Sequence, residues 1–179
     1  RQMWAPDIAR KGDKYYFYFP AKDKNDIFKI GVAIGDSPSG PFTPDPKPIE
    51  GSYSIDPAVF NDNCKYYMYF GGLWGGQLQK YRNNIYSNGN ELRSDDDFAF
   101  GPLVAELSDD MRGFSTSPEE IIIQDENGKP LLAGDNSRRY FEGPWVHKYN
   151  EKYYLSYSTG DTHFICYAIG DTPKGPFNY

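Results

Sequence analysis

The chain has 179 residues, enough for one domain with a hydrophobic core of its own, and carries a formal net charge of -6. An acidic chain offers no basic surface to a polyanion, and no run of about 18 apolar residues is present to span a bilayer, so we expect neither nucleic acid nor a membrane as a partner. Aromatic residues reach 17%, beside 18 Gly and 14 Pro, a mixture that favours short strands and tight turns over helices.

Three segments of the chain share one pattern, in which a proline precedes a pair of tyrosines by nine residues. The prolines and the first tyrosines of the pairs are Pro6 and Tyr15, Pro57 and Tyr66, and Pro144 and Tyr153. A polar turn stands directly ahead of each pair and an aromatic-rich run follows it. This order predicts a strand, a turn and a second strand in each segment.

The first and third segments continue alike into a third strand. Apolar residues alternate at period two over residues 30–34 and 165–169, and each run is followed by a turn with proline and glycine, where a central strand cannot continue. Antiparallel sheets of three or four strands, repeated along the chain, are typical of β-propeller blades. A β-sandwich would also contain many short strands, but it would not repeat over this distance in a fixed register.

The middle segment departs from the pattern after a glycine-rich run, Gly71-Gly72-Leu73-Trp74-Gly75-Gly76. A polar stretch follows over residues 77–97, and insertions in repeat proteins commonly lie in loops on one face, often the binding face. A solvated surface excursion is an equally good interpretation of its three consecutive aspartates, which lack the ligand spacing of a calcium loop. Strand pairing is expected to resume at residues 102–107, and residues 121–124 and 130–134 flank a turn that predicts a hairpin.

Two carboxylates stand at matching places in the second and third segments. Asp56 precedes Pro57 by one residue and Glu142 precedes Pro144 by two, so both acids are expected at one level of their blades, where equivalent edges converge on the propeller axis. Glycoside hydrolysis requires such a pair, because one carboxyl must stay protonated to deliver a proton and a nearby negative charge helps to keep it so. The alternative for Glu142 is a side chain that merely faces water where its strand begins.

Tryptophan and histidine side chains are the other candidates for a site. Trp4 and Trp74 suit stacking against the face of a sugar ring, whereas Trp145 is better explained by packing within its strand. His147 and His163 have no spacing that suggests a site. The two cysteines show no metal-ligand spacing, are expected to be free thiols, and leave the cellular compartment open.

Three motifs, in this order along the chain, resemble glycoside hydrolase family 43: Trp4-Ala5-Pro6-Asp7, Ser54-Ile55-Asp56-Pro57 and Phe141-Glu142-Gly143-Pro144. The resemblance extends over essentially the whole chain. It implies an all-β fold, a five-bladed β-propeller, and the cleavage with inversion of chains that contain xylose or arabinose. It also implies residue roles: Glu142 as the general acid, Asp56 as the carboxylate that tunes the pKa of Glu142 and orients it, and Trp4 and Trp74 as substrate-binding residues.

The same resemblance implies that parts of the propeller lie outside this chain. The family's general base is an aspartate of the first blade, upstream of the tryptophan motif, so no general base is expected here, and Asp7 is not assigned to that role. Residues 1–179 would be a partial catalytic domain, an internal fragment with about three of five blades and without the first and last. No metal is expected to be required for the proton chemistry, although a structural calcium ion on the propeller axis is compatible with the resemblance.

The leading interpretation is an exo-acting β-xylosidase or α-L-arabinofuranosidase that acts on xylo- or arabino-oligosaccharides from plant polysaccharides such as xylan. Two alternatives remain open. A non-catalytic carbohydrate-binding propeller would use the same aromatic residues without turnover. An endo-acting arabinanase of the same fold would have an open groove in place of a blind pocket. In either enzymatic interpretation, the chain alone is expected to be inactive because it lacks the base.

Overall fold

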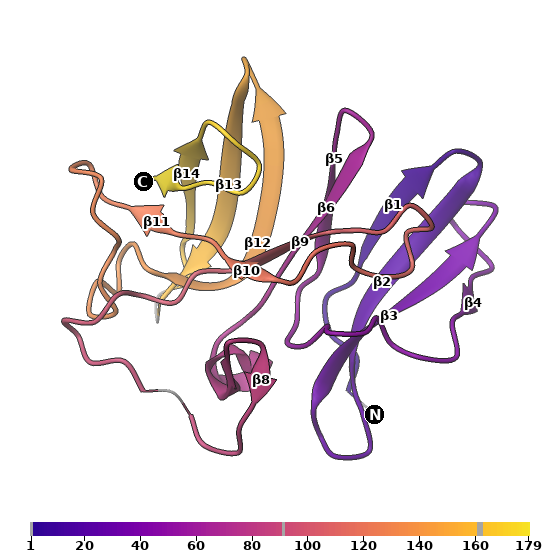
Figure 1. Cartoon of the computed structure of the whole chain (residues 1–179), viewed down its shortest axis with the longest axis horizontal. Helices are drawn as coiled ribbons and strands as arrows, with labels where there is room; N and C mark the ends of the chain where they lie inside the picture. The colour runs from indigo at the N-terminus through magenta and orange to yellow at the C-terminus, as the bar shows by residue number, and fades with distance from the viewer. Residues whose placement is uncertain (1, 91, 161–162) are drawn as a thin grey trace.

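The computed structural model describes residues 2–90, 92–160 and 163–179, and its three main sheets stand side by side in chain order (Figure 1). The all-β prediction is confirmed, since the helices of these residues are two short 3₁₀ turns, η1 (Trp74–Gly76) and η2 (Leu78–Lys80). Within the described ranges, no helix is long and apolar enough to cross a membrane.

The first sheet contains β1 (Asp7–Lys11), β2 (Lys14–Lys22), β3 (Phe28–Gly35) and β4 (Thr43–Pro44), in that order from edge to edge. Gly12, with φ at 59°, turns the chain between β1 and β2, because the left-handed region is open to glycine without steric cost. Alternating side chains bury one face of β3, as the period-two pattern predicted.

The second sheet has the order β10–β9–β6–β5. Its strands are β5 (Ala58–Asp62), β6 (Lys65–Phe70), β9 (Leu103–Glu106) and β10 (Glu119–Glu120). β9 begins and ends within residues 102–107, which confirms the predicted return to strand pairing. β6 is buried along nearly its whole length, and it therefore forms the centre of the core.

The insertion between β6 and β9 is only partly a solvated excursion. It contains the two 3₁₀ turns and a small hairpin of β7 (Tyr81–Arg82) and β8 (Ile85–Tyr86). The ring of Tyr81 stacks on that of Tyr53 with centroids 3.8 Å apart and an interplanar angle of 10°. Leu78 and Tyr81 are both buried, so the start of the insertion is anchored to the core. The exposed part of the insertion follows Tyr81 in the sequence.

The third sheet has the order β11–β15–β14–β13–β12. Its strands are β11 (Ile123–Gln124), β12 (Tyr140–Tyr149), β13 (Lys152–Thr159), β14 (Ile165–Gly170) and β15 (Phe177–Asn178). The hairpin expected around residues 121–134 is reduced to a turn with a single bridge, because β11 pairs in parallel with β15 instead. That pairing uses the outer edge of the sheet, which a local sequence pattern does not reveal.

The first strands of the three sheets lie against one another. β5 packs on both β1 and β12, so these three strands form the inner side of the arrangement. A side chain joins two of them directly: the Asp7 carboxylate accepts a hydrogen bond from the backbone N–H of Val59 at 2.7 Å. Residues at the entrances of these strands are thereby brought together, as the propeller interpretation predicted.

Repeated tyrosines connect each sheet to the next one. The hydroxyl of Tyr18, on β2, donates to the carbonyl of Met111 at 2.9 Å. Tyr69 has the equivalent place on β6, and its hydroxyl donates to the carbonyl of Pro173 at 2.7 Å. In both cases the acceptor lies in a loop of the following sheet, so the same register position makes the same kind of contact twice.

A second set of tyrosines points back to the preceding sheet. The Tyr66 hydroxyl donates to the carbonyl of Arg10 at 3.0 Å, and the Tyr153 hydroxyl donates to the carboxylate of Asp62 at 2.6 Å. Both are the first members of their tyrosine pairs, and both acceptors lie on the innermost strand of the neighbouring sheet. The tyrosine pattern of the sequence thus encodes contacts between sheets as well as strands within them.

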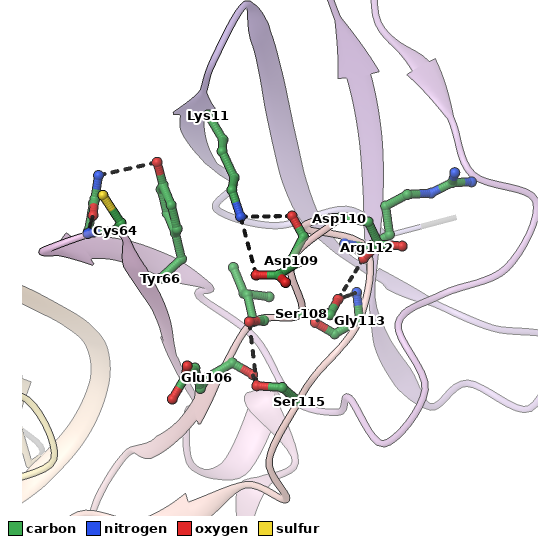
Figure 2. Close-up of polar contacts among 12 residues, drawn as sticks. Lys11, Cys64, Tyr66, Glu106, Ser108, Asp109, Asp110, Arg112, Gly113 and Ser115 are labelled. Atoms are coloured by element: carbon green, nitrogen blue, oxygen red, sulfur yellow. Dashed lines mark hydrogen bonds and ion pairs between the residues drawn. The ribbon is translucent and has the colours of Figure 1, made fainter.

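The loop between β9 and β10 fastens the second sheet to the first. Figure 2 shows Lys11 reaching the backbone carbonyl of Asp109, where its Nζ donates at 2.7 Å. Met111 is fully buried, and Arg112 forms a two-pronged pair with Asp45 at 2.8 and 2.7 Å. A bidentate pair next to a buried anchor holds its geometry better than an isolated surface ion pair.

Candidate active site

Asp56 is presented by a tightly held loop ahead of β5. Ser54 is fully buried, and its Oγ donates to the carbonyl of Gly76 at 2.6 Å and accepts from the N–H of Gly72 at 2.9 Å. The φ angles of Ser54 and Asp56 are 63° and 55°, in the left-handed region that residues other than glycine rarely adopt. Backbone strain of this kind persists only where surrounding contacts hold it, and it concentrates at functional sites.

The glycine-rich run, residues 71–76, supports both acidic segments. A Cβ at Gly72 or Gly76 would lie only 2.6 or 2.7 Å from the side chain of Ile55, so only glycine permits the two loops to pack this closely. On the other side, the N–H of Leu73 donates to the carbonyl of Phe141 at 3.0 Å. The run therefore joins the Asp56 loop to the segment that carries Glu142. The role of these glycines in the site was not predicted from the sequence.

Glu142 projects from an irregular part of β12. The pairing of β12 with β13 shifts register on both sides of Glu142, and Gly143 adopts a φ of 66°. The N–H of Gly143 donates to Oδ2 of Asp56 at 3.1 Å. The bulge thus turns the Glu142 side chain, which is 33% exposed, out of the strand and brings its backbone onto Asp56. The two acids predicted to converge are adjacent.

The electrostatics of the site favour the protonated form of Asp56. Burial, followed by the charge of Glu142, raises the pKa of Asp56 from 3.8 to about 6, against the opposing effect of the Gly143 N–H. Burial, followed by the charges of Asp56 and Glu142, also raises the pKa of Tyr140 well above its ordinary value. The Tyr140 hydroxyl therefore stays protonated, and it donates to the carbonyl of Gly71 beneath the site.

Of the two predicted substrate-binding tryptophans, Trp74 belongs to the glycine-rich run and Trp4 lies against it. The Trp4 ring packs on Phe28 with centroids 4.9 Å apart, and a Cβ at Gly75 would come within 3.0 Å of its outer edge. Trp4 is 37% exposed and Trp74 is 50% exposed, so each offers an open aromatic surface. Trp145 is 53% exposed in residues 1–179, because alternation along β12 points its neighbour Val146 to the core, and its packing stays a prediction.

Two further residues bear on the site. Asp7, whose carboxylate is bonded to the N–H of Val59, is committed to the contact between β1 and β5. Burial raises its pKa, while that hydrogen bond acts in the opposite direction. His163 was not assigned to any site from the sequence, yet its Nδ1 lies 4.0 Å from Oε1 of Glu142. Only the three-dimensional structure brings this residue to the acid, since the two are separated by the whole of β13.

The described residues do not supply a metal site. Among them, no group of three or more His, Cys, Asp or Glu side chains is arranged to hold an ion. Asp56 and Glu142, with a single histidine beside them, do not make an oxygen-rich shell of the six to eight ligands that calcium prefers. These residues therefore do not fit a calcium ion on their own.

We expect Asp56→Asn to stabilise the protein above neutral pH. Because the folded-state pKa of Asp56 is raised from 3.8 to about 6, its protonated form contributes stability that is full below pH 3.8 and lost as the pH rises through about 6. The neutral amide avoids that loss, which the two-unit shift places at no more than about 3 kcal/mol before solvent screening. Urea denaturation at pH 4 and pH 8 measures it, with the exposed Asp96→Asn as the control. An Asp56→Asn variant less stable than the parent at pH 8 but not at pH 4 would contradict the assignment.

The chain has relatives in one protein family. Residues 1–178 match the family model of the glycosyl hydrolases family 43. The chain belongs to this family. The family 43 chain is 58% identical over 180 residues to the xylosidase/arabinosidase of Bacteroides ovatus and 50% identical over 180 residues to the β-xylosidase of Xylanibacter ruminicola. Both alignments cover 100% of the chain but 55% and 56% of the relatives, so the chain spans about half their length.

Solved structures agree with this membership. The chain superimposes with a TM-score of 0.97, at 60% identity, on a β-xylosidase/α-arabinofuranosidase from a compost microbial metagenome, described in complex with xylotriose and in a calcium-free form. It superimposes with a TM-score of 0.98, at 56% identity, on a family 43 enzyme of Xanthomonas citri complexed with xylose. Each superposition includes 100% of the chain described here, but only 56% and 55%, respectively, of these two larger chains. The expected fold is confirmed: the family 43 chain contributes three sheets of a five-bladed β-propeller.

Proposed function

We propose that this chain carries the acid side of an inverting, exo-acting glycosidase that cleaves xylose- or arabinose-containing oligosaccharides, as a β-xylosidase/α-L-arabinofuranosidase. The observation that carries the proposal is the hydrogen bond from the N–H of Gly143 to Asp56, which joins the residue after Glu142 to a second carboxylate, and the exposure of Trp4 and Trp74 supports it. The names of the relatives and the xylose and xylotriose in related structures support the same substrate class. The raised pKa of Asp56, a carboxyl bonded to the residue that follows Glu142, favours catalysis over binding alone.

The proposed roles follow from the geometry. Glu142, whose side chain is 33% exposed, donates its proton to the glycosidic oxygen as the bond from that oxygen to the anomeric carbon breaks. Asp56, held from below by the Gly143 N–H, stays close enough to repel a second negative charge and so favours the protonated acid. Trp4 and Trp74 hold the sugar by its apolar faces. A water molecule attacks the opposite face of the sugar and loses its proton to a base.

We place that base, and the remainder of the propeller, outside residues 1–179. The chain spans about half of its relatives, and the outer faces of its first and third sheets carry exposed apolar side chains such as Ile8, Trp145 and Tyr167, which are 39%, 53% and 61% exposed. Further blades on these two sides would cover them and complete a catalytic domain. Two carboxyls and a water are enough for inversion, so the proposal needs no metal for the proton chemistry, and it leaves to calcium a structural role on the axis.

The substrate assignment is tested with a chimera in which residues 1–179 replace the matching segment of the Bacteroides ovatus xylosidase/arabinosidase. We expect it to hydrolyse an aryl β-D-xyloside or an aryl α-L-arabinofuranoside, and the released sugar to carry the inverted configuration by proton NMR. An aryl β-D-glucoside is the matched competitor, because it adds one hydroxymethyl group to the xyloside. Equal or faster turnover of the glucoside would contradict the pentoside assignment, and binding of xylotriose without any turnover would favour the carbohydrate-binding alternative.

A further inference from the structure

His163 stands beside the proposed general acid in a position that its own contacts define. It lies just before β14, with a φ of 52°, and its Nδ1 is 4.0 Å from Oε1 of Glu142. Its ring meets the ring of Phe141 edge to face, with centroids 4.8 Å apart and an interplanar angle of 82°. Phe141 is in turn fixed through its carbonyl by the N–H of Leu73. The imidazole is therefore supported by the residue directly before the acid.

Two ionisable side chains lie close to Glu142. The Asp56 carboxylate accepts a hydrogen bond from the N–H of Gly143, and the charge of Glu142, after burial, raises the pKa of Asp56. The Nδ1 atom of His163, whose side chain is 56% exposed, approaches Oε1 of Glu142. The hydroxyl of Tyr140 also faces this region, but it is committed to the carbonyl of Gly71 and stays protonated. His163 is thus the group among these that can donate a hydrogen bond to Glu142.

We propose that His163 is a positioning residue for Glu142, acting through an Nδ1–H donated to Oε1 while the other carboxyl oxygen delivers the proton to the leaving group. This inference rests on the proposed function, in which Glu142 is the general acid. At 4.0 Å the contact is longer than a hydrogen bond, and catalytic contacts of this kind commonly shorten when substrate is bound. The Nδ1 atom, not Nε2, is the one directed at the acid.

The contact gains strength at the moment of proton transfer. A hydrogen bond to a carboxylate is roughly twice as strong as one to a neutral carboxyl group, so the His163 donor stabilises Glu142 more after its proton has left than before. Only interactions that are stronger in the transition state accelerate the chemical step. His163 therefore eases departure of the proton from Glu142 once substrate is bound. The effect should depend on how much the leaving group needs the proton.

The experiment uses the same chimera and three substitutions of His163. Asn places an amide nitrogen where Nδ1 stood and tolerates the left-handed backbone, Gln extends its amide to the place of Nε2, and Phe keeps the ring on Phe141 without any nitrogen. We expect His163→Phe and His163→Gln to lower kcat on xylobiose about tenfold with little change in KM, and His163→Asn to retain most of the activity. On a xyloside with a dinitrophenyl leaving group all three should lie within about threefold of the parent, because that group departs without a proton.

The ratio of the two rates within each variant is the decisive quantity, because a partly unfolded preparation lowers both rates equally and leaves the ratio unchanged. The control is His147→Phe, a histidine on β12 that stacks on Tyr154 away from the acid, and its ratio should equal that of the parent. If His163→Phe and His163→Gln keep the parental ratio while Glu142→Gln changes it, the role of His163 is refuted and the general acid stands. If Glu142→Gln also keeps the parental ratio, the proposed function itself fails.

Discussion

Replacing Glu142 with Gln in the chimera is expected to lower kcat/KM for xylobiose by about 10²–10⁴-fold, the usual contribution of a general acid. The amide is nearly isosteric with the acid and can keep the backbone bulge at Gly143, so the bond from that N–H to Asp56 should survive. What the amide cannot do is deliver a proton to the departing sugar oxygen. A dinitrophenyl leaving group does not need that proton, and its xyloside should therefore lose far less activity.

Parallel kinetics on the two substrates measure this difference, with Glu151→Gln as the matched control, because Glu151 is an exposed glutamate whose side chain is paired only with Lys148 at the surface among the contacts described. The basic side of the pH profile on xylobiose supplies a second readout, since it should disappear when the acid is replaced. Equal losses on both substrates would mean that Glu142 binds substrate or supports the fold and does not transfer a proton.

The second large effect concerns residues 1–179 expressed alone, which we expect to release no detectable product from either pentoside. Absence of a general base removes about 10²–10⁴-fold in rate by itself. Inversion also needs the acid and base roughly 6.5–9.5 Å apart on opposite sides of the sugar, and only a closed ring of blades fixes that distance. In addition, the exposed apolar residues at both outer faces would favour association of the isolated chain.

The comparison is made at equal molar concentration between the isolated chain and the chimera, with light scattering to record association. A version of the chimera that lacks only the flanking sequence on one side shows which side supplies the missing group. Turnover by the isolated chain comparable with that of the chimera would place the base within residues 1–179, and Asp7 would then be the first carboxylate to test, despite its bond to Val59.

Local features of the fold were predictable because their causes are local. The fixed spacing from each proline to its tyrosine pair predicted three strand–turn–strand units, and the alternation at residues 165–169 predicted β14. The parallel pairing of β11 with β15 and the burial of Met111 against the first sheet were not predicted. Each depends on which distant edge or face is left open once the sheets form, and no short window of sequence contains that information.

Part of the candidate site was likewise predictable from the sequence, and part of it was not. Asp56 and Glu142 were found because equivalent positions of repeated units meet at one place, and the structure brings them together. The role of the glycine-rich run, residues 71–76, could have been inferred from the six-residue run that holds four glycines, which indicates close backbone packing. His163 left no such signal, because its approach to Glu142 depends on the path of the chain after β13. Whether Trp145 is packed depends on which elements cover that face of β12, and the sequence of the strand does not contain this information.

The hydrogen bonds that tyrosine hydroxyls form between neighbouring sheets affect how the protein unfolds. The hydroxyls of Tyr18 and Tyr66 join the first and second sheets, and those of Tyr69 and Tyr153 join the second and third. The middle sheet therefore takes part in all four of these hydrogen bonds, and each outer sheet takes part in two. In a linear array with nearest-neighbour coupling, opening of an interior unit breaks two interfaces and opening of a terminal unit breaks one. Amide protons of β6 should accordingly exchange with solvent only through global unfolding. Those of the first and third sheets should exchange through partial opening, which requires a smaller free energy.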